Sequence, residues 1–168
     1  MFYKRCKRPF LHPTCLLLDG IISNDIMPNE PIKAMAIKGG KGRCHYSHNN
    51  DRLEITNESN SPDVAHEIMH WLEKKNTKIL DNSLTFLEYR TQGEEAQELR
   101  KITNIKYDSD EVAKPDKFFS TYCGKIYNHQ ATEIMSMGIE QIFEHPKKFA
   151  ESDREYMSFV ISNLRGEI

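Results

Sequence analysis

One segment near the middle of the chain, residues 61–76, constrains the fold more than any other part of the sequence. Ser61 can cap a helix, Pro62 suits the first helical turn, and Asp63 complements the positive end of the helix dipole. Apolar residues then recur at the spacing of one helix face, namely Val64, Ile68, Trp71 and Leu72. We therefore expect a helix over residues 61–76, with one face buried in a hydrophobic core.

The same helix carries a His-Glu-Ile-Met-His sequence. His66 and His70 lie one turn apart, so both imidazoles can reach a single metal ion at about 2.0–2.1 Å. Glu67 is rotated by about 100° from His66, which places it outside the ligand set but within reach of a water on that ion. Zinc lowers the pKa of such a water, and the carboxylate can accept its proton as the water attacks a carbonyl group. The motif predicts a catalytic Zn²⁺ site with Glu67 as the general base.

A catalytic zinc ion needs a third protein ligand and keeps one position open. Glu133 and Glu140 are seven residues apart, two turns along one face of a later predicted helix and opposite its apolar stripe. Either carboxylate can approach the histidines if the two helices cross. A solvated acidic face is the alternative, so spacing alone leaves the third ligand open.

The segment from Val64 to Glu73 resembles the active-site helix of the zincin metallopeptidases. In the gluzincin branch of that family the third ligand is a Glu on a later helix, and Glu133, with Ser136 one turn on, matches that position best. Gluzincins of the thermolysin kind often carry Asp four residues after the ligand, where this chain has Met137. The resemblance implies Glu133 as the third ligand, without the usual Asp to support the site.

The second half of the chain more loosely resembles a zincin-like segment of phage head-morphogenesis proteins and related small bacterial domains. The matching stretches are Gly93 to Glu95, Tyr122 to Tyr127, Thr132 to Glu140 and Asp153 to Gly166. This resemblance implies an alternative function, in which a non-catalytic zincin-like domain serves protein binding or phage-related assembly. The intact Glu67 favours catalysis instead, because a purely structural zinc site has no use for a base.

Three residues upstream of Glu133 are candidates to line the site: Tyr122, Tyr127 and His129. A Tyr or His donor near the metal would stabilise the oxyanion of a tetrahedral intermediate, and Tyr127 is our catalytic candidate for that role. A core tyrosine and a loop histidine are the alternatives. Glu73, one turn beyond the motif, is expected to be solvated.

The remaining pattern predicts an α+β fold. The first 60 residues are β-rich, with strand candidates at 15–22, 32–37, 43–46 and 52–56. In zincins a strand such as the last of these borders the cleft and pairs with an extended peptide. After the motif helix we expect a connection over 77–93, a short helix over 94–102, an exposed loop over 108–116 and helices over 131–143 and 153–164. We therefore expect one zincin-like domain over residues 1–168, in which a small twisted sheet packs on the motif helix and residues 61–168 are mainly helical.

Net charge and hydropathy limit the kinds of partner that we expect for this protein. The 168 residues carry a formal net charge of -2, which gives no basic footprint for nucleic-acid binding. No stretch approaches the roughly 18 consecutive apolar residues of a membrane span. The basic start of the chain resembles a signal peptide only faintly, because Pro9, Pro13 and Asp19 interrupt it. We expect a cytoplasmic protein that acts on a peptide or protein substrate.

Taken as a whole, the sequence predicts a zinc-dependent metallopeptidase that hydrolyses peptide bonds with an activated water. Its zinc would be held by His66, His70 and Glu133. A metal-dependent hydrolase of a non-peptide bond is a third possibility beside the non-catalytic zincin-like domain. The substrate, the cleavage preference and the oligomeric state are not predicted.

Overall fold

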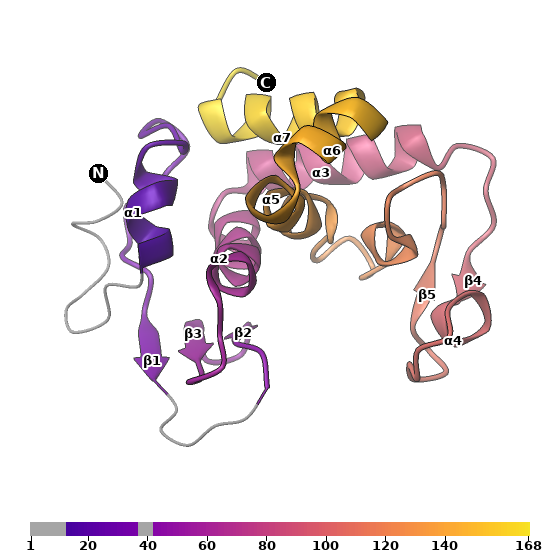
Figure 1. Cartoon of the computed structure of the whole chain (residues 1–168), viewed down its shortest axis with the longest axis horizontal. Helices are drawn as coiled ribbons and strands as arrows, with labels where there is room; N and C mark the ends of the chain where they lie inside the picture. Colours follow the sequence, from indigo (N-terminus) through magenta and orange to yellow (C-terminus); the bar gives the residue numbers. More distant parts are fainter. Residues whose placement is uncertain (1–12, 37–41) are drawn as a thin grey trace.

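The computed structural model describes residues 13–36 and 42–168, which form a mixed fold of helices and two small sheets (Figure 1). The predicted α+β class is confirmed at that level. The elements of the first half are α1 (Pro13–Asp19), β1 (Ala34–Ala36), β2 (His45–Ser47), β3 (Arg52–Ile55), α2 (Ser61–Lys75) and α3 (Thr77–Arg90). Those of the second half are β4 (Gln97–Glu98), α4 (Leu99–Ile102), β5 (Val112–Ala113), the 3-10 helix η2 (Thr121–Gly124), α5 (Ile134–Glu144), α6 (Pro146–Ser152) and α7 (Arg154–Arg165).

Helix α2 has its N-cap one residue earlier than the sequence suggested. Asn60, rather than Ser61, is the N-cap, and its side chain accepts a hydrogen bond of 2.8 Å from the Asp63 backbone N–H. The Asp63 carboxylate accepts in return from the Asn60 N–H, which completes a capping box. The helix ends at Lys75, within the predicted range.

The first sheet has the strand order β1-β3-β2, with β1 parallel and β2 antiparallel to β3. Strands β1 and β3 lie within the predicted ranges 32–37 and 52–56, and β2 overlaps the last two residues of the range 43–46. Residue 37 lies outside the described residues. Tyr46 on β2 is opposite Leu53 on β3, and both side chains are buried in the same core as the apolar face of α2. Strand β2 therefore forms an edge of this sheet close to α2.

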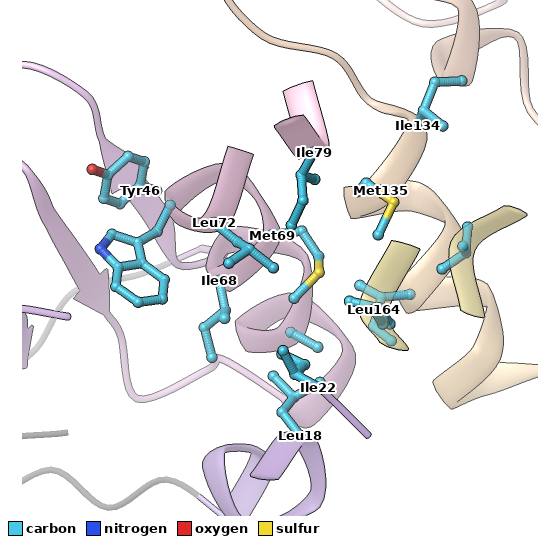
Figure 2. Close-up of a cluster of buried hydrophobic side chains, with 14 of the residues drawn as sticks. Leu18, Ile22, Tyr46, Ile68, Met69, Leu72, Ile79, Ile134, Met135 and Leu164 are labelled. Carbon is cyan, nitrogen blue, oxygen red and sulfur yellow. The ribbon is translucent and has the colours of Figure 1, made fainter. Parts of the chain in front are cut away.

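Helix α2 lies at the centre of the core and packs along α5 (Figure 1). Met69 on α2 and Met135 on α5 are fully buried and face one another, whereas Tyr46 lies on the other side of α2 (Figure 2). Gly138 lets α5 approach α7, because a Cβ there would lie 2.4 Å from a methyl carbon of Val160. This packing brings the start of α5 beside the histidine-bearing turn of α2.

Two predictions in the first half are wrong. Residues 15–22 were expected to form a strand, but Pro13–Asp19 is a helix that packs against α2. Leu18 is buried in this helix, and Leu17 is exposed. The expected connection over 77–93 contains helix α3. Asn76 caps that helix, and its buried face includes Ser83, a polar residue that conceals the helical periodicity in the sequence.

Boundaries also differ in the second half. Within residues 94–102 only Leu99–Ile102 is helical, and strand β4 precedes it. The stretch 108–116, expected to be an exposed loop, contributes strand β5 with a fully buried Ala113. Helix α5 begins at Ile134, three residues after the predicted start at 131, and α7 matches its predicted range to within one residue. Among the described residues, no helix has the length and apolar character needed to cross a bilayer.

Candidate metal centre

His66, His70 and Glu133 converge on one point between α2 and the start of α5. The two histidine Nε2 atoms are 3.2 Å apart, and each lies 3.3 Å from Oε2 of Glu133. Zinc–ligand bonds of about 2.0–2.2 Å in a tetrahedron place the ligand atoms about 3.3–3.6 Å from one another. The three atoms therefore have the spacing of three corners of a zinc tetrahedron, and the side chains need little rearrangement to bind an ion.

Glu133 is held in place through both of its carboxylate oxygens. It is the residue just before α5 and is almost completely buried. The Tyr127 hydroxyl donates to Oε1 at 2.5 Å, and the Ser136 hydroxyl, one turn into α5, donates to Oε2 at 2.7 Å. These bonds leave Oε2 directed at the two histidines.

Glu140, the rival candidate for the third ligand, contacts the other nitrogen of His66. Its Oε2 lies 2.9 Å from His66 Nδ1 and 3.0 Å from a guanidinium nitrogen of Arg43. A carboxylate at Nδ1 favours the tautomer with the proton on that nitrogen, which leaves Nε2 free to coordinate a metal. Glu140 therefore lies where it could orient a histidine ligand. In a thermolysin-like site we would expect that role for an Asp at the position of Met137.

The site stabilises positive charge. Burial lowers the pKa of His66, but its hydrogen bonds to Glu133 and Glu140 outweigh that effect and raise the pKa to about 9. Burial alone would raise the pKa of Glu133, yet the neighbouring histidines hold it well below its usual value. His70 differs from His66 in one respect, since its buried Nδ1 has no hydrogen-bond partner within the described part of the chain. The surplus of carboxylates over imidazoles gives the cluster a negative formal charge when the histidines are neutral, and His66, His70 and Glu133 could hold a metal ion.

Glu67 faces the same cavity as the three candidate ligands. The cavity has a volume of about 350 Å³ and is lined by residues of β2, α2 and the segment 122–133. One carboxylate oxygen of Glu67 accepts a hydrogen bond of 2.7 Å from the Tyr46 backbone N–H. A second cavity, of about 450 Å³, shares His66, Glu67 and Tyr122 with the first and is also lined by Glu140.

The other residues named from the sequence differ in whether they line this cavity. Tyr127 and Tyr122 both line the first cavity, whereas His129 is exposed and lines a different one. His48 also lines the first cavity, with its ring centroid 6.3 Å from that of His70. Glu73 was expected to be solvated, and that expectation is wrong: only 2% of it is exposed. Helical spacing could not reveal this, because its partner Thr132 is 59 residues away in the sequence.

We expect Glu140→Gln to weaken zinc binding by about 10–100-fold, the usual cost of losing a group that orients a metal-binding histidine. The amide can still contact His66, but it lacks the negative charge that favours the required tautomer and balances the ion. Competition with a chromophoric zinc chelator measures the affinity. Glu144→Gln, an exposed position one turn further along α5, is the matched control and should bind zinc as tightly as the unmodified protein. Equal affinities in the two variants would contradict this role for Glu140.

No family model matches the chain, and neither the curated proteins nor the solved structures contain a match.

Proposed function

We propose that this protein is a zinc-dependent metallopeptidase. The observation that carries the proposal is the spacing of 3.2–3.3 Å among the two histidine nitrogens and the Glu133 oxygen, with Glu67 in the same cavity. Two His and one Glu form a ligand set typical of catalytic zinc, in which one coordination position stays open. A carboxylate beside that position has a use in hydrolysis that it would not have in a structural site.

The chain's own residues supply the proton transfers in this proposal. Zinc, when bound, would act as a Lewis acid that polarises the scissile carbonyl and makes water more acidic. The Tyr46 N–H holds one oxygen of Glu67, which leaves the other free to accept the proton of the attacking water. Glu67 would then pass that proton to the leaving amine, as a general base that becomes a general acid.

Tyr127 and Tyr122 have different roles in the proposal, namely to orient Glu133 and to donate to the oxyanion. The Tyr127 hydroxyl proton is committed to Glu133, so its first function would be to orient that ligand. The Tyr122 hydroxyl lies 3.3 Å from that of Tyr127 and 3.4 Å from Nζ of Lys125, and its side chain lines both cavities. A hydroxyl that accepts from a lysine is well suited to donate to an oxyanion, so we propose Tyr122 as the donor while the Tyr127 proton stays on its bond to Glu133.

A polypeptide fits this site better than a compact ligand does. Two cavities share His66, Glu67 and Tyr122 in their linings, which would offer room for an extended chain beside Glu67. Strand β2 borders the first cavity and is an edge strand of the described sheet, and its Tyr46 N–H is engaged by Glu67. An extended peptide could pair with the remaining backbone groups of such an edge.

A broad peptide library tests the proposed activity. The zinc-loaded protein should cleave a subset of peptides, 1,10-phenanthroline should abolish cleavage, and added Zn²⁺ should restore it. The change is expected because the chelator removes the group that polarises the carbonyl. Full zinc occupancy with no cleavage of any peptide would contradict a peptidase and favour the non-catalytic zincin-like domain.

A further inference from the structure

Glu73 is a buried carboxylate that the proposed chemistry does not use. It lies on α2, three residues after His70, and its side chain is directed into the interface with the start of α5. Its Oε1 accepts a hydrogen bond of 2.6 Å from the Thr132 hydroxyl, and its Oε2 accepts one of 3.1 Å from the Thr132 backbone N–H. Burying a carboxylate is costly unless such partners are present, and Thr132 supplies two of them.

Thr132 connects Glu73 to the candidate ligand Glu133. It is completely buried and directly precedes Glu133 in the chain. Its hydroxyl oxygen also accepts a hydrogen bond of 3.1 Å from the Ile134 N–H, at the first residue of α5. The residues on both sides of Glu133 are therefore tied, directly or through one hydroxyl, to a carboxylate on the helix that carries the histidines.

Apolar packing between α2 and α5 constrains the backbone beside Glu133 less directionally than hydrogen bonds do. Met69 and Met135 hold the two helices together, but methionine side chains are flexible and adapt to small shifts. Metal ligands, in contrast, must lie within about 0.2 Å of their ideal distances. Two directional hydrogen bonds to a buried carboxylate define the position of the backbone at residue 132 more sharply than such packing does.

We propose that Glu73 is a positioning residue which, through Thr132, sets Glu133 at bonding distance from a metal held by His66 and His70. This inference rests on the proposed metal centre. In this role Glu73 contacts neither the substrate nor the metal. It also explains why a carboxylate one turn beyond the histidine motif is buried instead of solvated.

A matched pair of threonine substitutions tests the inference. Thr132→Val keeps the shape of the side chain and removes the hydroxyl, and it should weaken zinc binding by about 10–100-fold, as expected for loss of an outer-shell partner. Thr91→Val makes the same change at another fully buried threonine, whose hydroxyl donates only to the Leu87 carbonyl at 2.8 Å. It should leave the zinc affinity unchanged. Thr132→Ser, which restores the hydroxyl, should bind zinc almost as tightly as the unmodified protein.

Cobalt substitution separates a positioning role from a general loss of stability. The visible absorption of bound Co²⁺ reports the geometry of its ligands, so Thr132→Val should change that spectrum and Thr91→Val should not. Denaturant titration of each metal-free variant shows that affinities are compared between folded proteins. If Thr132→Val does not fold, Glu73→Gln, which keeps the shape and one acceptor oxygen, should show the weakened zinc binding instead.

The outcomes distinguish this inference from the proposed function. An unmodified protein that binds no zinc would overturn the metal centre and, with it, the role of Glu73. The other contrary result is that the unmodified protein binds zinc and that folded Thr132→Val or Glu73→Gln binds it as tightly as Thr91→Val does. That result would overturn the role of Glu73 alone.

Discussion

Replacing Glu67 with glutamine should leave zinc bound and lower turnover by at least about 10²-fold, the usual scale for loss of a general base. Glutamine has the same shape and can still accept the hydrogen bond from the Tyr46 N–H, so the cavity should keep its form. It cannot take a proton from water at neutral pH. Rates on a peptide selected from the library, together with zinc content, measure both parts of the prediction.

Glu144→Gln provides the control for this substitution as well, because it makes the same chemical change at an exposed position on α5. It should retain full turnover. Unchanged hydrolysis in Glu67→Gln would remove the proposed mechanism. Loss of zinc from Glu67→Gln would instead make Glu67 a ligand or a structural residue.

The second large effect concerns the metal itself. His66→Ala and His70→Ala should each lose most of the bound zinc, with a fall in affinity beyond the roughly 10–100-fold that removal of a supporting group costs. Each substitution removes one of the three proposed ligand atoms. Metal analysis after gel filtration and chelator competition give the occupancy and the affinity.

His45→Ala is a suitable control, because His45 is exposed on β2 and pairs with Glu54 instead of the metal centre. It should bind zinc as the unmodified protein does. Full occupancy in a variant that lacks both His66 and His70 would contradict the metal centre as drawn.

The histidine-bearing helix could be predicted from local sequence because everything that defines it is local. Its cap, its first-turn proline and its apolar periodicity lie within residues 60–75, and the structure moves the cap by only one residue. The spacing of His66 and His70 follows from the helix alone. Their convergence with Glu133 required the resemblance, because spacing left Glu133 and Glu140 equal.

The parts that the sequence did not predict depend on contacts between distant segments. Glu140 reaches Nδ1 of His66 and not its Nε2 because of how α2 and α5 pack, which no pattern within α5 encodes. Glu73 has the charge of a surface residue, and its burial depends on Thr132 and Ser83, which are distant from it in the sequence. Helix α3 was missed for a related reason, since the buried Ser83 satisfies its hydroxyl on the Ile79 carbonyl and so can lie on an apolar face.

In the proposed centre, His66, His70 and Glu133 hold one zinc ion. A crystal structure of the protein grown with equimolar Zn²⁺ shows whether they do. We predict one ion bonded to Nε2 of both histidines at about 2.0–2.1 Å and to a Glu133 oxygen at about 2.0–2.2 Å. A Glu133 carboxylate more than about 3 Å from an ion held by both histidines would contradict the ligand assignment. The absence of any ion between these side chains would contradict the metal centre itself.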